Sequence, residues 1–241
     1  MSWLCTAGEY QLFFNRDENL KRRPALAPVK HETGGMTYLS PLDGDYGGTW
    51  IAVNESGLTL CLLNRYDGTV GRCAPDFRSR GEIIPELIVE SSLEQMADSL
   101  RVMSLADYNP FTLVAFSRAG ESWRGQWGGD DLIIDWDLGW RGMITSSSFA
   151  TADVVATREK AYQHQIGDKD DLSAEDLRRF HASHDLISGA RSVCLHRQDA
   201  VTVSLTRIYV TGEQARCWYY PSSPCAISTD SLTEMGLPQR R

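Results

Sequence analysis

The sequence has no hydrophobic run long enough to cross a membrane. Its longest uncharged apolar stretches, such as 58–63 and 111–116, are far shorter than the roughly 20 residues that a membrane helix needs. The N-terminus also lacks a basic segment, and Glu9 and Arg16 interrupt it before the apolar core of a signal peptide can develop. We therefore expect neither a membrane span nor secretion.

Positive charge is scarce as well. The chain has 24 Lys and Arg residues against 32 Asp and Glu residues, which gives a formal net charge of -8 and an isoelectric point near 5.1. A protein that binds duplex nucleic acid needs a basic face that displaces counterions from the phosphates. The acidic balance argues against a nucleic-acid partner, and the basic clusters at 21–23 and 240–241 are interpreted as solvated charges.

Closely spaced cysteines are also missing. The six cysteines are far apart and none forms a Cys-x-x-Cys pair, which argues against a zinc knuckle or a small disulfide scaffold. We interpret them as reduced thiols in a cytoplasmic protein. His181 and His184 are close enough to suit a metal, but no third ligand is near in the sequence. We interpret them instead as cationic or capping residues at a helix end, and we expect no metal and no cofactor.

The composition that is present is typical of a folded domain. With 42% hydrophobic and 23% charged residues, the 241-residue chain lies outside the disordered, collagen-like and coiled-coil ranges. Its length suits one large domain as well as two small ones. Because no internal repeat or low-complexity linker divides the chain, we predict a single domain over residues 1–241.

Apolar and β-branched runs predict a chain rich in strands. The predicted strands are 2–5, 10–14, 49–53, 58–63, 112–117, 121–127, 132–136, 143–147, 192–195, 201–209 and 215–220. Turn residues at 6–9 and 54–57 predict two hairpins, and the strands of the second are apolar enough to be buried on both faces. Pro24 and Pro28 indicate an extended stretch that cannot join a ladder normally.

Helical periodicity appears in three places: between 83 and 105, over 153–165 and over 174–181. Ser91 with Glu94 predicts a capping box at the start of the first helix, and Ser173 with Asp176 predicts the cap of the last. The strands and helices do not alternate as βαβ units would. This order favours antiparallel sheets with helices packed outside them.

The tetrapeptide Asn-Arg-Asp-Glu at 15–18 directly follows a very apolar strand. It ends the segment Leu-Phe-Phe-Asn-Arg-Asp-Glu at 12–18, and Gly-Gly-Thr-Trp-Ile-Ala-Val-Asn-Glu-Ser-Gly-Leu follows at 47–58. A third segment, 192–204, reads Ser-Val-Cys-Leu-His-Arg-Gln-Asp-Ala-Val-Thr-Val-Ser. In this order the segments resemble the NRDE family, also called the transport and Golgi organisation 2 family, over nearly the whole chain.

The resemblance implies an N-terminal-nucleophile (Ntn) hydrolase-like fold of the α+β class. In this four-layer αββα sandwich, two antiparallel sheets lie between helical layers. The chain is also similar to the bile-salt hydrolase and penicillin acylase group. There, a cysteine directly after the initiator methionine attacks a non-peptide amide and its own α-amino group serves as the base. A nearby cation favours the thiolate, and a free α-amine titrates near neutrality.

The resemblance also implies a set of site residues. Arg16 and Asp17 would orient the nucleophile, and Asn64, at the end of a strand, would donate its amide to the oxyanion. Asn64 as a turn-capping residue is the alternative. The other residues expected to bind substrate are Asn15, Glu18, Thr145, Ser146 and Arg197. Ser146 stands where the related group has an asparagine, and a serine side chain has a shorter reach.

Cys5 is a poor candidate for the nucleophile, because hairpin geometry separates it from Arg16. If the turn centres between residues 7 and 8, Cys5 faces Tyr10, and Arg16 lies roughly 20 Å further along the strand at about 3.3 Å per residue. Bacterial members of the resembled family begin Met-Cys-Thr before a segment like Ser-Trp-Leu at 2–4. We therefore expect a catalytic cysteine upstream of Met1, or its loss in this member.

Two functions stay open at this point. The first is a hydrolase or acyltransferase that acts on a non-peptide linear amide. The second is a non-catalytic carrier of haem or another hydrophobic carboxylate ligand, since the resembled family is linked to haem and lipid handling. In both cases the partner is a small molecule. The segment 123–140 interleaves four Trp with four Asp residues, which indicates core packing beside solvated acids or, alternatively, an apolar ligand wall.

Overall fold

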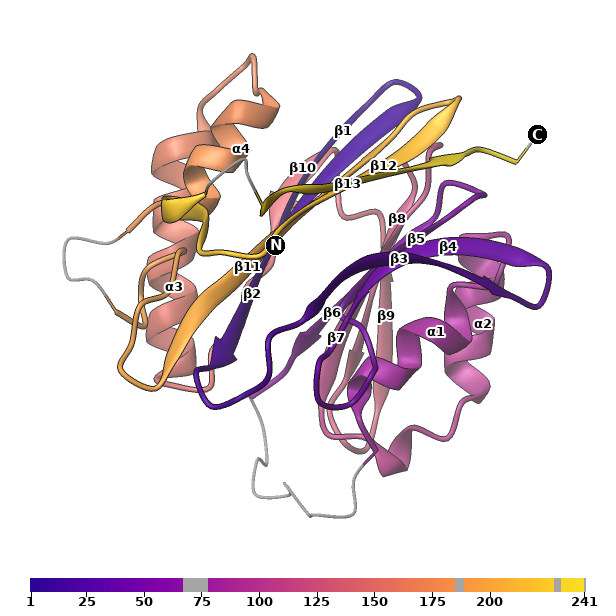
Figure 1. Cartoon of the computed structure of the whole chain (residues 1–241), viewed down its shortest axis with the longest axis horizontal. Coiled ribbons are helices and arrows are strands. Elements are labelled where there is room, and N and C mark those ends of the chain that lie inside the picture. The colour runs from indigo at the N-terminus through magenta and orange to yellow at the C-terminus, as the bar shows by residue number, and fades with distance from the viewer. Residues whose placement is uncertain (67–77, 185–188, 228–230, 241) are drawn as a thin grey trace.

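The computed structural model describes residues 1–66, 78–184, 189–227 and 231–240. Their strands form two antiparallel sheets that stack face to face, with helices on both outer faces (Figure 1). The predicted α+β class and the four-layer αββα order are confirmed. No helix in the described part of the chain is long and apolar enough to cross a membrane.

The first sheet has the strand order β10-β1-β2-β11-β12-β13 in the described residues. Its strands are β1 (Ser2–Thr6), β2 (Glu9–Asn19), β10 (Arg141–Met143), β11 (Ala200–Val210), β12 (Gln214–Tyr220) and β13 (Thr233–Pro238). The two longest strands, β2 and β11, pair with each other at the centre of this sheet. Of the Asn-Arg-Asp-Glu motif near the end of β2, Arg16 is buried and Asp17 is exposed.

The second sheet has the order β3-β4-β5-β6-β7-β8-β9. Its strands are β3 (Leu26–Thr33), β4 (Met36–Leu42), β5 (Ile51–Asn54), β6 (Thr59–Asn64), β7 (Phe111–Phe116), β8 (Ser122–Trp127) and β9 (Leu132–Trp136). Each pair of neighbours in this sheet is antiparallel. Its strands follow the order of the chain, but the helical segments between residues 80 and 107 lie between β6 and β7, so the sheet is not a simple series of hairpins.

The helices divide between the two outer faces (Figure 1). Residues of α1 (Ile83–Leu87) and α2 (Leu93–Val102) pack on the second sheet, while those of α3 (Thr151–Tyr162) and α4 (Ala174–His181) pack on the first. The described residues also contain three short 3-10 helices, η1 (Arg80–Glu82), η2 (Leu105–Asp107) and η4 (Pro224–Ala226), and one π turn, η3 (Gln163–Gly167).

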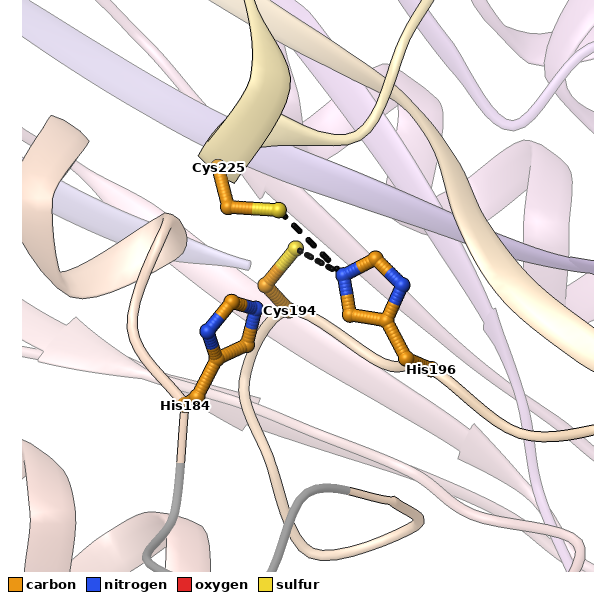
Figure 2. Close-up of side chains that lie close together, drawn as sticks. All are labelled: His184, Cys194, His196 and Cys225. Carbon is orange, nitrogen blue, oxygen red and sulfur yellow. Dashed lines mark hydrogen bonds between the residues drawn. The ribbon is translucent and has the colours of Figure 1, made fainter.

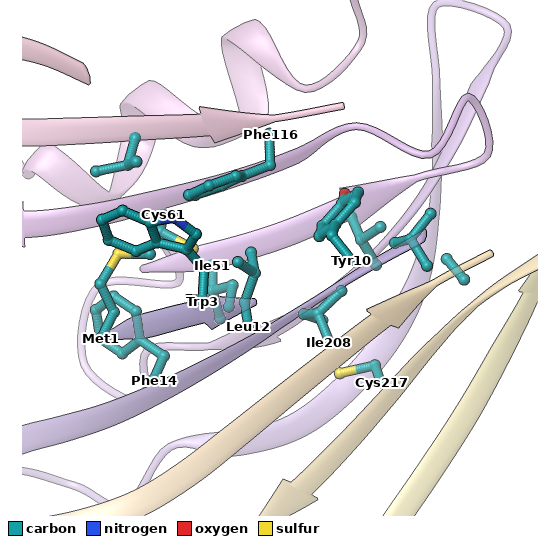
Figure 3. Close-up of a cluster of buried hydrophobic side chains, with 14 of the residues drawn as sticks. Met1, Trp3, Tyr10, Leu12, Phe14, Ile51, Cys61, Phe116, Ile208 and Cys217 are labelled. Atoms are coloured by element: carbon teal, nitrogen blue, oxygen red, sulfur yellow. The ribbon is translucent and has the colours of Figure 1, made fainter. Parts of the chain in front are cut away.

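A hydrophobic core lies between the two sheets (Figure 3). Alternation along β2 sends Leu12 and Phe14 into this core, where they meet residues of the second sheet such as Ile51 and Phe116. The residue between them, Phe13, points to the opposite face and packs under α4. This period of two is what a strand buried on both faces requires.

The first hairpin has the predicted register. Cys5 pairs with Tyr10 and Ser2 with Phe13, so paired residue numbers sum to 15. Gly8 in the turn has a φ of 80°, a conformation that glycine adopts without strain. Arg16 therefore lies beyond the partner of Met1, as the sequence predicted.

The second hairpin is also confirmed, and Asn54 explains its position. The Asn54 Oδ1 atom accepts hydrogen bonds from the backbone of Ser56 and Leu58 and closes the turn. The Nδ2 atom of Asn54 donates to the carbonyls of Ile88 and Glu90, beyond the end of α1. One side chain thus closes the hairpin and attaches it to the helical layer.

Several predicted boundaries are wrong. Strands β3, β4 and β13 were not predicted, and the predicted strand 143–147 is instead the short β10, which ends at Met143. Residues 192–195 form no strand. Pro28 joins the edge strand β3 at an irregularity between Leu26 and Val29, because an edge strand tolerates a residue that cannot donate.

The helices differ from prediction in detail. Ser92, not Ser91, caps α2 by accepting from the backbone N–H of Gln95. The Gln95 side chain returns the bond to the backbone of Ser91, so the reciprocal pattern is shifted by one residue from the predicted box. The capping box of Ser173 and Asp176 at α4 is confirmed. Helix α3 ends at Tyr162 and continues as a π turn to Gly167.

Candidate functional site

A cavity of about 840 Å³ lies at the end of the sandwich where β2 and β6 terminate. The cavity wall combines residues from both sheets and from α3 and α4. It includes every predicted substrate-binding residue and three of the predicted catalytic residues: Asn15, Arg16, Asp17, Glu18, Asn64, Thr145, Ser146 and Arg197. The geometry therefore brings together residues that are far apart in the sequence. Their chemical roles stay predictions.

Arg16 is a buried and tightly held charge in this wall. The Nη2 atom of Arg16 donates to Asp43 Oδ2 at 2.6 Å and to Glu18 Oε2 at 3.0 Å. The guanidinium also lies 4.6 Å from the centre of the Trp50 ring, and the Arg16 side chain is 7% exposed. Two carboxylates and an aromatic face hold this cation in one orientation.

The same carboxylates continue into a wider ion network. Asp43 Oδ1 accepts from Arg22 Nη2 at 2.6 Å, and Glu18 Oε2 accepts from Arg22 Nη1 at 2.9 Å. Asp43 also accepts from the backbone N–H groups of Asp45 and Tyr46, which fixes the turn on which it stands. The sequence analysis did not single out Asp43, because its carboxylate meets Arg16 only through the tertiary fold.

The Gly-Gly-Thr-Trp segment at 47–50 forms part of the rim. A Cβ atom on Gly48 would lie 2.7 Å from the carbonyl carbon of Gly81, closer than packed atoms allow. The backbone N–H of Thr49 donates to the Gly81 carbonyl at 3.0 Å. Two backbones therefore touch here because neither glycine has a side chain, and this contact places Trp50 beneath Arg16.

Asp17 points away from Arg16, because neighbouring residues in a strand face opposite sides. Thr202 donates to Asp17 Oδ1 at 2.5 Å, and Arg158 Nη2 of α3 lies 3.6 Å from Asp17 Oδ2. The ladder between β2 and β11 shifts register between Thr202 and Ser204, directly opposite this pair. A β-bulge at this point re-aims the side chains at the end of the sheet.

Arg158 was missed by the sequence analysis, and helical periodicity alone gives no signal for it. Its Nη1 atom donates to Thr145 Oγ1 at 2.8 Å and to the Ser146 carbonyl at 3.3 Å. The side chain is 6% exposed, and its Nε atom has no hydrogen-bond partner within the described residues. Burial lowers the pKa of Arg158. The positive charge of Arg158 in the cavity wall is therefore only partly balanced by the carboxylate of Asp17.

His181 was predicted to be a cationic or capping residue at a helix end, but the structure shows it as a buried ring at the end of α4. Its ring is buried, with Nδ1 2.8 Å from Asn15 Oδ1 and Nε2 2.9 Å from Ser2 Oγ. The amide of Asn15 donates to the carbonyls of His181 and Val193, so its oxygen accepts from the Nδ1–H and leaves Nε2 as the acceptor for Ser2. Burial lowers the pKa of His181 well below 6.5, so the ring is neutral.

Ser2, His181 and Asn15 are hydrogen-bonded in the order of a Ser-His-Asn catalytic triad, but their role is structural. Ser2 is 0% exposed and is not part of the cavity wall. The network ties the start of β1, the end of β2 and the end of α4 together under the wall. His184 does not accompany His181, since it lies with Cys194, His196 and Cys225 in a separate cluster (Figure 2).

Asn64 ends β6 and lines the cavity as predicted. Its Nδ2 atom donates to the Tyr66 hydroxyl at 3.0 Å. A primary amide carries two N–H donors, so Asn64 can donate to one further group in the cavity. Arg197 lines another part of the wall and is tied to Asp199 by two hydrogen bonds of 2.9 and 2.6 Å.

The chain belongs to the Transport and Golgi organisation 2 family. The sequence model of that family, described as "Transport and Golgi organisation 2", matches residues 4–126. No curated protein matches the chain. The resemblance drawn from the Asn-Arg-Asp-Glu and Gly-Gly-Thr-Trp segments is thereby confirmed.

Solved structures support the fold. Penicillin V acylase from Agrobacterium tumefaciens aligns with a TM-score of 0.53 and 13% identity, over 98% of this chain and 86% of that chain. The Caenorhabditis elegans ortholog of N-acylethanolamine-hydrolyzing acid amidase aligns with a TM-score of 0.57 and 11% identity, over 86% of this chain and 91% of that chain. At this identity the likeness shows an Ntn-hydrolase fold and leaves activity to other arguments.

In this member of the family, Met1 lies at the cavity. Its amino group donates to the Ile144 carbonyl at 2.8 Å, and burial lowers the pKa of that group from 8.0 to about 5. Met1 also forms part of the cavity wall, while its side chain reaches the core near Cys61 (Figure 3). The first strand therefore points its N-terminal end at Asn15 and Arg16.

Cysteines do not contribute to the described part of the cavity wall. Cys5 lies in the core between the sheets, where burial raises the pKa of its thiol to about 11. Cys61 is fully buried, and burial raises its pKa as well. Cys73 lies outside the described residues. The geometry offers no support for Cys5 as a nucleophile.

The tryptophan-rich segment does not line the cavity either. Trp123 and Trp127 are buried beneath the helical layer of the second sheet, whereas Trp136 and Trp140 are exposed. Their places agree with core packing for the first pair. The apolar ligand wall that was the alternative for this segment is absent from the described lining.

Proposed function

We propose that the protein hydrolyses, or transfers the acyl group of, a non-peptide linear amide, using a thiol nucleophile that precedes Met1 in the native chain. The observation that carries this proposal is the register of the first hairpin. Paired residues sum to 15, so the residue two positions before Met1 would face Arg16 if β1 continued. The extended strand would enter the cavity between β2 and the segment after β10.

The surrounding residues suit this reaction. The Arg16 guanidinium would favour a thiolate opposite it, and Asn64 would donate to the oxyanion that forms on the amide carbonyl. The α-amino group of the cysteine that supplies the thiol, at the mature N-terminus, takes the thiol proton. The sulfur bonds to the carbonyl carbon, the carbon–nitrogen bond breaks, and the amine leaves with that proton. Water then hydrolyses the thioester, which releases the acid and restores the thiol.

The experiment begins with protein isolated from its native source. Mass spectrometry of the N-terminal peptide is expected to find a cysteine upstream of Met1. That form is then assayed with penicillin V and with an N-acylethanolamine, because two proteins of similar fold carry these substrates in their names. Release of the free acid is expected from at least one linear amide.

A matched pair of variants tests the roles of the wall. Asn64→Ala is expected to lower kcat about 100-fold or more, the usual effect of losing an oxyanion donor. Arg101 on α2 is exposed and is not part of the described cavity wall, so Arg101→Lys is expected to keep full activity. A native chain without a cysteine before Met1, or equal activity in both variants, would contradict the amidase proposal.

A second function is favoured by Arg158. Arg16 already contacts two carboxylates, whereas the carboxylate contact of Arg158 is Asp17 at 3.6 Å. A buried guanidinium with partial compensation is suited to bind the carboxylate of a hydrophobic ligand such as haem or a fatty acid. This non-catalytic carrier needs no cysteine in the cavity.

Titration of the protein with haem or a fatty acid distinguishes the carrier function from the enzyme function. A carrier is expected to give a haem spectral shift or to retain fatty acid after purification, and Arg158→Met is expected to weaken binding at least tenfold. Arg178→Met provides the control, because Arg178 pairs with Glu175 on the exposed face of α4. Absence of both haem and fatty-acid binding in the unmodified protein would exclude this function.

A further inference from the structure

Four potential metal ligands from distant parts of the chain converge beside the cavity. His184 follows α4, Cys194 and His196 precede β11, and Cys225 lies in η4 (Figure 2). One ligand atom from each residue lies within 4.8 Å of all the others. Both sulfur atoms and both rings are directed toward one point between them (Figure 2).

The distances match a tetrahedral metal site. The Nε2 atom of His196 lies 3.5 Å from Cys194 Sγ and 3.2 Å from Cys225 Sγ. With zinc bonds of about 2.3 Å to sulfur and 2.0–2.1 Å to nitrogen, the ligand atoms of a regular tetrahedron lie about 3.3 to 3.8 Å apart. The cluster therefore needs small side-chain movements to surround a single ion.

We propose that His184, Cys194, His196 and Cys225 bind one Zn²⁺ ion in a Cys₂His₂ site. Two thiolates and two imidazoles are the ligand set that zinc takes in closed structural sites, with all four positions filled by protein. The sequence analysis missed this site because the ligand spacing, with ten residues from His184 to Cys194 and twenty-nine from His196 to Cys225, resembles no compact zinc motif.

Proton balance agrees with this assignment. Zinc binds thiolates, and each thiol that becomes a ligand releases one proton to solvent. Binding is therefore expected to release protons and to weaken as the pH falls.

The site has a positioning role for the cavity. Val193, Leu195 and Arg197 line the cavity, while Cys194 and His196 between them point to the metal cluster. This segment already has hydrogen bonds of its own, including those from Cys194 N–H to the Ser183 carbonyl and from Leu195 N–H to Thr202 Oγ1. An ion would clamp it to η4 and to the end of α4, and so fix that part of the cavity wall.

The test uses the full chain, purified without chelators and then dialysed against buffer with a trace of Zn²⁺. Elemental analysis is expected to find one zinc ion per chain. Replacement by Co²⁺ is expected to give the intense visible absorption of a tetrahedral thiolate complex. Reduced and non-reduced protein are expected to have the same mass, since the thiols are not in a disulfide.

Two ligand variants and a control complete the test. Cys225→Ser and His196→Gln are each expected to weaken zinc affinity by more than the roughly 10- to 100-fold that follows loss of an outer-shell partner. Cys225 is exposed, so its replacement does not disturb a core, and circular dichroism checks folding. His164→Gln is the control, because His164 is exposed on η3 and outside the cluster. Zinc that is absent from the unmodified protein, zinc that binds both ligand variants unchanged, or a Cys194–Cys225 disulfide would overturn the proposal.

Discussion

Arg16 shows how a buried charge can serve the fold and the site at once. Its guanidinium is held by Asp43, Glu18 and the Trp50 ring, which leaves it few alternative orientations. Removing one partner from a buried ion network is costly, because the remaining charges stay desolvated and lose part of their compensation. Arg16 therefore belongs to the stability of the cavity wall as much as to its chemistry.

Arg16→Met is expected to lower the free energy of unfolding by about 1–3 kcal/mol, since Asp43 and Glu18 would lose their buried partner and keep only Arg22. Urea unfolding followed by circular dichroism measures the change. Arg101→Met, at an exposed pair with Asp98, is expected to change stability by less than about 1 kcal/mol. Equal effects from the two substitutions would contradict the buried-network interpretation.

The buried His181 ring is expected to make the free energy of unfolding depend on pH. Its pKa is lowered in the folded protein by burial, while the unfolded chain has an ordinary histidine near 6.5. Below about pH 6.5 the unfolded state binds a proton that the native state does not, so stability falls as the pH falls, by up to about 1.4 kcal/mol per pH unit. This loss continues until the lower folded pKa is reached.

His181→Gln is expected to flatten that part of the stability profile between pH 7.5 and 5, as measured by urea unfolding at several pH values. The Met1 amino group also titrates in this direction, but its contribution is common to both proteins and cancels in the difference. His164→Gln, at an exposed position, is expected to leave the profile unchanged. A parallel shift of the whole curve in His181→Gln would mean that titration of the ring has no part in it.

At the scale of elements, the sequence predicted correctly those features that depend on residues close together in the chain. The hairpin of β1 and β2 and the capping box of α4 depend on residues within a few positions of each other, and both are confirmed. Strands β3 and β13 were missed because they are edge strands, with exposed polar residues and a proline in each. Edge positions weaken the apolar pattern from which strands are predicted.

In the candidate site as well, the sequence predicted the residues of a contiguous motif and missed those that tertiary contacts bring to it. The Asn-Arg-Asp-Glu motif gave the β2 side of the cavity, because a family signature is contiguous in sequence. Asp43, Arg158 and His181 come from other elements and meet this motif only through the stacking of sheets and helices. The four residues of the proposed zinc site were missed for the same reason, since their proximity depends on where α4, β11 and η4 end.

The contact between Gly48 and Gly81 is an element-scale feature that can be tested directly. Gly48→Ala is expected to lower the free energy of unfolding by about 1–3 kcal/mol, because the new methyl group would force two backbones apart. Thermal or urea unfolding measures this change. Gly212→Ala meets no atom within 4 Å and is expected to change stability by less than about 0.5 kcal/mol. A neutral Gly48→Ala would show that the rim moves freely.

At the scale of the whole molecule, the two sheets depend on each other across the core between them. The central strands are β2 and β11 in one sheet and β6 and β7 in the other. Strands β6 and β7 are buried along nearly their whole length, while β2 and β11 are buried at about half of their positions and half-buried at most of the others. Strands β3, β9 and β13 have mostly exposed or half-buried residues. Opening the edges costs less buried apolar area than opening the centre.

Native-state hydrogen exchange is therefore expected to be slowest in β2, β11, β6 and β7, at rates set by global unfolding. Exchange in β3, β9 and β13 is expected to be at least tenfold faster, because these strands can open without exposing the core between the sheets. Since β2 and β6 both end at the cavity, the site would be carried by the most stable strands of both sheets. Slow exchange in β3 and β9 equal to that in β6 and β7 would contradict this division and would indicate that the edges unfold together with the centre.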